Sequence, residues 1–386
     1  MKHTHILIIR FSALGDVAMT VPIVWALAQQ YPDVRITVLS RPVSRTLFED
    51  LAPNVNFMEA DLKGEYHGVK GLNALFRRLV AKRFTHIADL HSVLRSEYLR
   101  MRFNLGLYRV EHINKHRHQR RQLVAPQPRK VLQQLPTSFQ NYLDVFSRLG
   151  FPIATSRYCF RSIFEPIGPI SPIGPIGPIG PIRPISPISP TPPSRGNLNL
   201  LPKAIGPKRS WEQWIGIAPF AAHKGKVYPQ EKMEQVIERL TQQYPKARLF
   251  LFGRGKDEDL TFPHWAERWP QCTIVSWHTE TLYQELILMS HLDVMLSMDS
   301  ANQHLASLTA TPVVSVWGAT HPYAGFMGWR QDPQNAIQLS DLPCRPCSIY
   351  GQKPCQRGDY ACLNGIAPEM ILERMNQILT KNQQEV

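Results

Sequence analysis

Most of the chain repeats one pattern, in which a short apolar run is followed by a longer amphipathic run. Short apolar runs between turn-forming residues are typical of buried strands, and the longer runs have helical periodicity. This alternation favours parallel sheets covered by helices on both faces. We therefore expect a doubly wound α/β protein. The predicted strands are 5–11, 35–39, 55–59, 86–90, 108–113, 213–218, 247–253, 273–275, 293–297 and 312–317. The predicted helices are 16–30, 71–82, 138–150, 229–244, 281–290, 300–308 and 368–381.

A proline-rich run at residues 166–193 interrupts the alternation. Proline recurs at every third position from Pro166 to Pro190, but glycine occupies only some of the third positions that a collagen helix would need. Because proline neither continues a helix nor donates to a sheet, we expect an extended, polyproline-like surface insert. The alternative is a docking segment for an aromatic-lined groove.

The length of 386 residues is sufficient for two domains, each with a buried core. The expected divisions are an N-terminal domain at 1–160, a linker at 161–210, a C-terminal domain at 211–365 and a final helix at 366–386. We expect this helix to pack back on the N-terminal domain.

No apolar run is long enough to span a bilayer, and Arg10 interrupts the apolar stretch near the N-terminus. That stretch has no small-residue cleavage site, so we do not interpret it as a signal peptide. A cytoplasmic location is the expectation. The six cysteines are therefore expected to form no disulfide framework.

The net charge of +14 is concentrated in two basic runs, at 77–83 and 112–121. A chain this basic often meets a polyanion such as a nucleotide, a nucleic acid or an anionic lipid. The alternative is a solvated basic surface. The sequence has no zinc-finger pair, recognition helix or RNA-binding strand motif that would favour nucleic acid.

The loop at 12–16 (S-A-L-G-D) joins the first predicted strand to a helix. Gly15 permits a tight turn, and Asp16 lies at the carboxyl end of a parallel strand, where open α/β sheets bind ligands. Two roles remain open for Asp16: it caps the helix, or it acts as a catalytic carboxylate.

A second strand-to-helix loop lies at 297–304 (S-M-D-S-A-N-Q-H). The free N–H groups at the start of its helix, from Ser300 and Ala301 onward, would favour an anion. Asp299 would cap this helix or accept from a sugar hydroxyl. His304 shares one helix face with Ser300, as a ligand contact or as a structural residue.

Two further loops follow predicted strands of the C-terminal half. Lys224 and Lys226 could neutralise a diphosphate, or they are ordinary solvated lysines. Gly253-Arg254-Gly255 is only a fragment of a dinucleotide-binding motif, and Glu258 beyond it could accept from a ribose.

Four of the six cysteines are crowded near the C-terminus with the spacing C-x2-C-x7-C-x6-C. One C-x2-C pair and two further thiols could form a structural zinc site, although the second half lacks a matching pair. The alternatives are reduced thiols or an oxidised pair. The residues are Cys344, Cys347, Cys355 and Cys362.

Taken together, these loops resemble glycosyltransferase family 9, the ADP-heptose:lipopolysaccharide heptosyltransferases. The matching segments are 8–22 (I-I-R-F-S-A-L-G-D-V-A-M-T-V-P), 218–229, 298–306 (M-D-S-A-N-Q-H-L-A) and 312–320. The resemblance implies a GT-B fold, in which two Rossmann-like doubly wound domains face a central cleft. The N-terminal domain would bind the acceptor and the C-terminal domain the nucleotide sugar.

The resemblance also implies inverting, metal-independent transfer of a heptose-like sugar from a nucleotide-diphosphate donor such as ADP-heptose. Asp16 would be the catalytic base, and no cofactor would be required. The donor-binding residues would be Lys226, Glu258, Asp299, Ser300, Ala301 and His304. Ala301 stands where the family usually has glycine, so its methyl group would crowd a closely approaching phosphate or sugar.

The expected acceptor is a lipopolysaccharide core or a related anionic glycolipid at the inner face of the cytoplasmic membrane. We expect Arg95, Arg117 and Arg120 to contact it. Two other classes remain as alternatives: a dinucleotide-dependent oxidoreductase and a non-enzymatic polyanion-binding protein. Against the first, no strand leads into a complete G-x-G-x-x-G.

Overall fold

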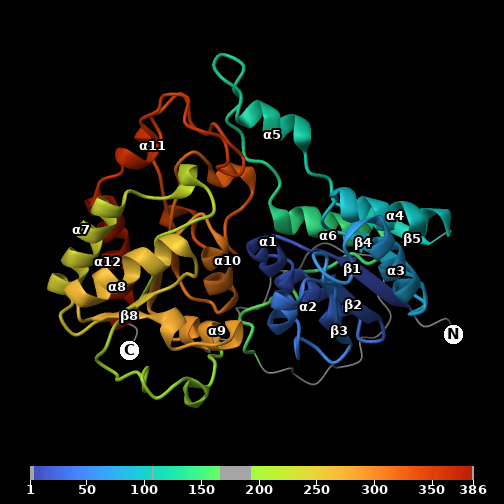
Figure 1. Cartoon of the computed structure of the whole chain (residues 1–386), viewed down its shortest axis with the longest axis horizontal. Helices are drawn as coiled ribbons and strands as arrows, with labels where there is room; N and C mark the ends of the chain where they lie inside the picture. The colour runs from blue at the N-terminus through green and yellow to red at the C-terminus, as the bar shows by residue number, and fades with distance from the viewer. Residues whose placement is uncertain (1–3, 107, 166–192, 385–386) are drawn as a thin grey trace. The chain divides into compact units, whose positions relative to one another are not determined.

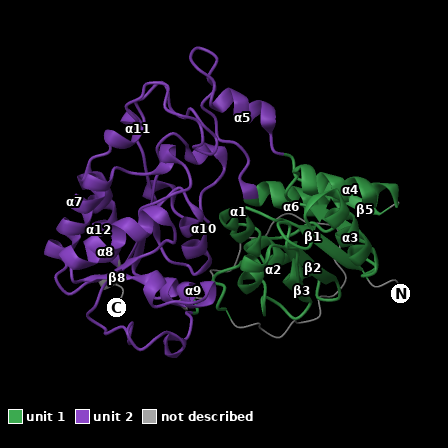
Figure 2. Ribbon diagram, viewed as in Figure 1, with its two compact units in different colours: residues 1–114, 139–194 green, residues 115–138, 195–386 purple. Residues whose placement is uncertain are grey.

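The computed structural model describes residues 4–106, 108–165 and 193–384, which divide into two compact units (Figure 2). Unit 1 comprises residues 1–114 and 139–194, and unit 2 comprises residues 115–138 and 195–386. The chain thus enters unit 2 at residue 115, returns to unit 1 at 139 and enters unit 2 again at 195. The sequence interpretation placed all of 115–138 in the N-terminal domain, whereas its contacts belong to unit 2. The proline-rich run lies outside the described residues, apart from Pro193.

Unit 1 contains a five-stranded parallel sheet in the order β3-β2-β1-β4-β5 (Figure 1). Every strand coincides with a predicted apolar run. The central strand β1 is buried at all five positions, which accounts for its uninterrupted apolar sequence. The strands are β1 (His5–Ile9), β2 (Arg35–Ser40), β3 (Val55–Glu59), β4 (His86–Asp89) and β5 (Arg109–His112).

The helix predicted at 16–30 is two helices, α1 (Leu14–Ala18) and α2 (Val21–Gln30). Pro22 lies in the first turn of α2, where its missing N–H costs no helical hydrogen bond. The amphipathic helix α3 (Gly68–Val80) buries Leu72, Leu75 and Leu79 against one face of the sheet. The remaining helices of unit 1 are α4 (Leu94–Leu105) and α6 (Ser138–Arg148), which begins at the boundary of the two units.

Unit 2 contains a six-stranded sheet, again parallel throughout, in the order β11-β10-β9-β6-β7-β8. The prediction of two parallel-sheet α/β domains is confirmed. The two central strands of the unit 2 sheet, β6 and β9, are fully buried. The strands are β6 (Trp214–Ala218), β7 (Arg248–Leu251), β8 (Cys272–Ile274), β9 (Val294–Met298), β10 (Val313–Val316) and β11 (Ala336–Ile337).

The helices of unit 2 follow its strands in the same alternation. They are α5 (Arg117–Leu123), α7 (Gln230–Gln243), α8 (Lys256–Arg268), α9 (Leu282–Ser290), α10 (Ala301–Leu308), α11 (Ala361–Asn364) and α12 (Pro368–Gln384). None of the helices in the described part of the chain is long and apolar enough to cross a membrane.

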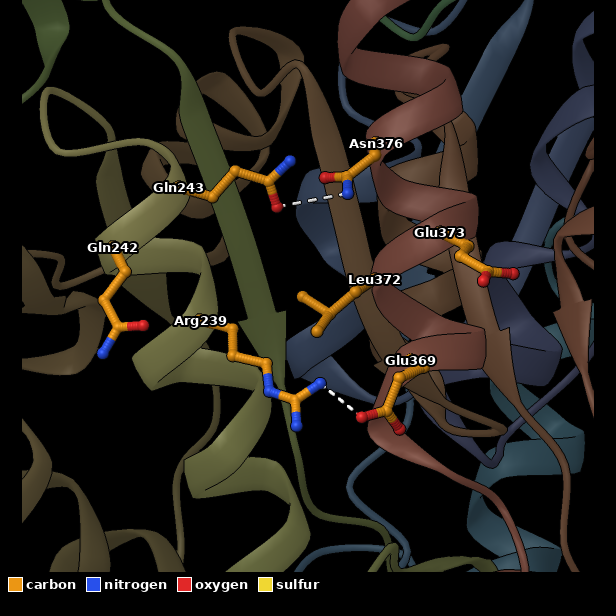
Figure 3. Close-up of a pocket in the computed structure, with 7 residues that line it drawn as sticks. All are labelled: Arg239, Gln242, Gln243, Glu369, Leu372, Glu373 and Asn376. Carbon is orange, nitrogen blue, oxygen red and sulfur yellow. Dashed lines mark hydrogen bonds and ion pairs between the residues drawn. The ribbon is translucent and has the colours of Figure 1, made fainter.

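Helix α12 packs on α7 within unit 2, contrary to the expectation that it packs on the N-terminal domain. Its buried Ile371, Met375 and Leu379 join the same core as the apolar residues of α7. Figure 3 shows the shallow hollow above this contact, where Arg239 pairs with Glu369 and Asn376 donates to Gln243. The apolar stripe of α12 thus finds its partner inside unit 2.

The predicted linker also belongs partly to unit 2. Lys208 forms a mostly buried ion pair with Asp293, at 2.6 Å from Nζ to Oδ1, at the start of β9. The backbone N–H of Gly196 donates to Ser290 at the end of α9. Residues 195–210 therefore pack on this unit.

Candidate functional site

In unit 1, Asp16 lies in the loop and short helix that follow β1. It is the third residue of α1, and its Oδ2 accepts from the N–H of Ala13, 3.1 Å away. The Asp16 side chain is 28% exposed, so solvent reaches the carboxylate. Asp16 thus bonds back to the residue before the helix instead of occupying the cap position itself.

The partner of this carboxylate is Arg10, whose side chain is only 8% exposed. The Nη2 atom of Arg10 lies 2.8 Å from Asp16 Oδ2, and its Nη1 donates to the carbonyl of Leu90 at 2.5 Å. Tyr142 donates to the backbone carbonyl of Asp16 at 3.3 Å. A buried cation and a backbone N–H therefore both orient the carboxylate and stabilise its charged form.

A second loop of unit 1 lies beside this one because β4 pairs with β1 and ends at the same edge of the sheet. It contributes His91, whose ring lies 3.5 Å from the hydroxyl of Ser12 and accepts from the N–H of Phe11 at 3.4 Å. The buried Asp89 accepts from the N–H groups of His91 and Ser92. The arrangement holds an imidazole against the Asp16 loop.

In unit 2, the corresponding edge carries an ion pair between Lys226 and Asp299. Lys226 follows β6 and Asp299 follows β9, the neighbouring strand. The Lys226 Nζ and Asp299 Oδ2 atoms are 2.9 Å apart, with side chains 15% and 4% exposed. Gln303 on the first turn of α10 donates to Asp299 Oδ1 at 3.0 Å. Each oxygen of the Asp299 carboxylate thus contacts a group of its own unit.

Helix α10 begins directly after this pair. Ser300 is its cap residue, with its hydroxyl 3.3 Å from that of Ser297, and Ala301 is its first residue. His304 is buried on the next turn. The expectation that Asp299 caps this helix is wrong, because Ser300 occupies the cap position and Asp299 faces Lys226.

Glycine residues permit the close packing around Lys226. A Cβ atom on Gly351 would lie 2.7 Å from Lys226 Cγ, and Gly351 has a φ of +80°. A Cβ on Gly225 would lie 2.8 Å from the carbonyl oxygen of Gly351. The lysine stem therefore lies directly on backbone, which fixes where its ammonium group points.

Glu258 lies in the first turn of α8, at the same edge of the sheet, after β7. Its side chain folds back over Gly253 and Gly255, where added Cβ atoms would lie 2.8 Å from it. Both glycines have φ values that favour glycine, +147° and +156°. The G-x-G fragment thus makes room for Glu258. The structure brings the carboxyl ends of β6, β7 and β9 together with Lys226, Glu258 and Asp299.

The three predicted acceptor arginines fall in both units. Arg95 is exposed at the start of α4, at the same sheet edge as Asp16. Arg117 and Arg120 lie on α5 in unit 2, and Arg117 is exposed. Arg120 donates to the hydroxyl of Tyr350 at 2.7 Å and lies 5.1 Å from the Phe326 ring centroid.

The cysteine cluster does not form the expected zinc site. Among the described residues, no group of three or more histidine, cysteine or acidic side chains is arranged to hold a metal ion. Cys344 is exposed, whereas Cys362 is buried, and all four are free thiols. Burial raises the pKa of the Cys362 thiol to about 11, and the other three thiols lie near enough to raise it further. The four cysteines thus gather in one region.

Arg345, between the first two of these cysteines, organises the surrounding loops instead. Its guanidinium donates to the carbonyls of Gly318, Thr320 and Leu339 and to the side chain of Gln338. Burial lowers its pKa to about 10. The sequence reasoning missed this residue, because an isolated arginine gives no signal of burial.

Comparison with known proteins identifies the domain that carries the unit 2 site. Residues 201–355 match glycosyltransferase family 9 (heptosyltransferase). No curated protein sequence matches the chain. The match to family 9 over residues 201–355 supports a glycosyltransferase activity.

Solved structures with the same fold include two heptosyltransferases and one family 9 glycosyltransferase. The Escherichia coli ADP-heptose lipopolysaccharide heptosyltransferase II is 18% identical, with 98% of this chain and 100% of that chain covered and a TM-score of 0.63. A family 9 glycosyltransferase from Veillonella parvula is 16% identical, with 99% and 98% covered and a TM-score of 0.68. Escherichia coli heptosyltransferase WaaC with ADP is 13% identical, with 97% and 100% covered and a TM-score of 0.61. The expected GT-B type of fold is confirmed.

Sequence reasoning missed several residues that hold the predicted site residues in place. Arg10 contacts Asp16, His91 contacts Ser12, and Gln303 contacts Asp299. The Gln303–Asp299 pair is separated by four residues, so helical spacing could have suggested it. The contact of His91 with Ser12 could be found only once the pairing of β4 with β1 was known.

Proposed function

We propose that this glycosyltransferase moves a heptose-like sugar from a nucleotide-diphosphate donor, such as ADP-heptose, to a hydroxyl of a lipopolysaccharide core or related glycolipid. The observation that carries this proposal is the pair of strand-end loops: an oriented carboxylate at Asp16 and an anion-favouring helix start at Ser300 beside Lys226. The family match and the ADP bound to the similar WaaC support the choice of donor.

The diphosphate of the donor would lie at the first turn of α10. The N–H groups after Ser300 have no partner earlier in their own helix, and the helix dipole favours negative charge there. Lys226 supplies a cation that Asp299 already holds in position. His304, on the same helix, would contact the donor, and Glu258 would accept from the ribose. The methyl group of Ala301 would narrow the space for the donor at this turn.

Asp16 would act as the general base. Its carboxylate accepts the proton of the acceptor hydroxyl while the hydroxyl oxygen forms a bond to the anomeric carbon of the donor. The bond from that carbon to the diphosphate oxygen breaks, and the nucleoside diphosphate leaves with the electron pair. One displacement without a covalent intermediate inverts the anomeric centre. Lys226 and the N–H groups of α10 stabilise the leaving charge, so the proposal requires no metal ion.

The acceptor is proposed to be an anionic glycolipid. Arg95, at the Asp16 edge of unit 1, and Arg117, on the exposed side of α5, offer guanidinium groups suited to phosphate or carboxylate groups. Arg120 would join them, with its orientation set by Tyr350. A location at the inner face of the cytoplasmic membrane would bring the enzyme to such a lipid.

The test is the Asp16→Asn variant, which keeps the shape of the side chain and removes its basicity. We expect turnover with ADP-heptose and deacylated lipopolysaccharide core to fall by about 10²–10⁴-fold. The thermal shift produced by ADP should remain unchanged, because the donor loops lie in unit 2. Asp33→Asn, an exposed substitution of the same kind in unit 1, is the matched control. Near-full turnover in Asp16→Asn would remove this residue as the base.

A further inference from the structure

A polar hollow of unit 1 lies away from the Asp16 loop. It has a volume of about 280 Å³ and is lined by the first residues of β1 and β2, by Arg45, by β3 and by the end of α3. Asp16 follows the carboxyl end of β1, whereas His5 begins that strand. At about 3.3 Å per residue, the length of β1 alone separates the two by roughly 13 Å. The hollow is therefore distinct from the candidate catalytic site.

Positive charge gathers around this hollow. Arg35 begins β2, in register with His5, and Arg78 and Lys82 come from the last turn of α3 and the residue pair beyond it. The one carboxylate that lines the hollow, Glu59, is 3.2 Å from Arg45. Within the part of the chain that the structure describes, Arg35, Arg78 and Lys82 form no ion pair. The hollow therefore carries a net positive charge, because Glu59 offsets only one of the surrounding cations.

The floor of the hollow is polar and ordered. The buried imidazole of His5 is hydrogen-bonded to the hydroxyl of Thr37, at 2.9 Å from Nε2 to Oγ1. Asn56 lies opposite Thr37 on β3 and adds an amide. The amide of Asn56 can donate to an oxygen-rich ligand, whereas the hydroxyl of Thr37 and the imidazole of His5 bond to each other.

One cation at the rim is held in place before any ligand arrives. Arg78 donates to the hydroxyl of Tyr66 at 2.6 Å, and Tyr66 is buried. An arginine at a helix C-terminus also stabilises the helix dipole, and this alternative role would suffice for Arg77 on the same turn. Stabilisation of the helix dipole does not explain why Arg78 lines the same hollow as Arg35 and Lys82. Burial first, and then the charges of Arg35 and Lys82, lower the pKa of His5 to about 4.

We propose that this hollow is a binding site for a phosphate group, with Arg35, Arg78 and Lys82 as its cations and His5, Thr37 and Asn56 as its floor. Its volume is close to the lower end of the range for small-ligand pockets, which suits a phosphate or a compact phosphorylated headgroup. The phosphate could belong to a soluble molecule or to an anionic lipid. Either source would use the basic run at 77–83, which the catalytic proposal leaves without a role.

The experiment compares two double variants of equal charge. Arg35→Gln with Lys82→Gln removes two cations from the hollow, while Lys70→Gln with Arg77→Gln removes two exposed cations from α3 outside it. Binding of inorganic phosphate is measured by calorimetric titration at constant ionic strength. A saturating concentration of ADP is present so that the α10 site does not contribute. We expect the hollow variant to bind phosphate about tenfold more weakly than both the wild type and the control variant.

A second arm identifies the source of the phosphate. Sedimentation with phosphatidylcholine vesicles, with and without phosphatidic acid, is measured for the same proteins. Loss of both phosphate and vesicle binding in the hollow variant alone indicates a lipid headgroup, and loss of phosphate binding alone indicates a soluble ligand. Equal phosphate affinities in the two double variants, or no phosphate binding by the wild type, would overturn the proposal.

Discussion

Removal of Lys226 should leave Asp299 as an uncompensated buried charge. In the Lys226→Met variant, the carboxylate that is 4% exposed loses the cation 2.9 Å away and retains only the hydrogen bond from Gln303. Breaking a buried pair in this way typically costs 3–5 kcal/mol. Because Lys226 is itself 15% exposed, some water reaches the pair, and we expect a loss of about 3 kcal/mol in the free energy of unfolding.

The converse substitution should cost less. In Asp299→Asn, the ammonium group of Lys226 keeps its partial exposure of 15% and the asparagine can still accept a hydrogen bond from it, so we expect a loss of about 1 kcal/mol. The double variant buries no charge and should be more stable than Lys226→Met alone by about 1–2 kcal/mol. A rescue of this kind distinguishes a buried ion pair from two independent packing contacts.

The assay is urea unfolding followed by tryptophan fluorescence. The two units can unfold separately, so the transition to follow is that of unit 2, which contains the buried Trp214 and Trp317. Lys224→Met, an exposed neighbour on the same loop, is the matched control and should change stability by less than about 0.5 kcal/mol. If Lys226→Met is as stable as this control, or if the losses of the single variants simply add, the reasoning is refuted.

Three further predictions concern other parts of the structure. Gly351→Ala should lower the stability of unit 2 by about 1–3 kcal/mol and weaken ADP binding in calorimetry. Gly358 also has a φ of +80°, but a Cβ added there would meet no atom within 4 Å. Gly358→Ala should therefore lower the stability only through backbone strain. His5 has its pKa lowered from 6.5 to about 4, so the unfolded chain binds the proton first and unit 1 should lose stability as the pH falls from 6.5 to 4. His5→Gln should reduce that dependence in urea unfolding at a series of pH values. Finally, Arg120→Met should speed proteolysis within 115–138 about fivefold, since it loses a hydrogen bond and ring contacts, whereas Arg117→Met should not.

The loops of the candidate site could be predicted because a parallel sheet gathers the carboxyl ends of its strands. Apolar runs placed β1, β6 and β9, and the residues directly after them could therefore be assigned to one edge of each sheet. That rule placed the loops that carry Asp16, Lys226 and Asp299, whereas the choice of Lys226 over Lys224 came from the family resemblance. The ion pair between Lys226 and Asp299 could not be predicted from that rule, because it depends on β6 and β9 being neighbours.

Segment 115–138 shows what local pattern could not reveal. Its assignment to unit 2 rests on contacts with residues roughly two hundred positions away. Lys130 donates to the carbonyls of Cys344 and Pro346, Leu135 to that of Tyr323, and Ser138 to that of Gly325. These acceptors are backbone carbonyls, which carry no sequence signature. The dense basic run suggested a solvated or ligand-binding surface, whereas part of it anchors the segment.

From the sequence, Asp16 was open to two interpretations, as a helix cap and as a catalytic carboxylate. In the structure it is the third residue of α1, so it does not occupy the cap position. The cap bond from Ala13 and the ion pair with Arg10 both use Oδ2. An asparagine at this position could still accept from Ala13 through its amide oxygen, but it could not neutralise the buried Arg10. Asp16→Asn should therefore preserve the start of α1 while destabilising unit 1 through the unpaired guanidinium, by about 1–3 kcal/mol. The catalytic loss must be measured under conditions where this variant remains folded, since only turnover lost by folded enzyme reports on the base.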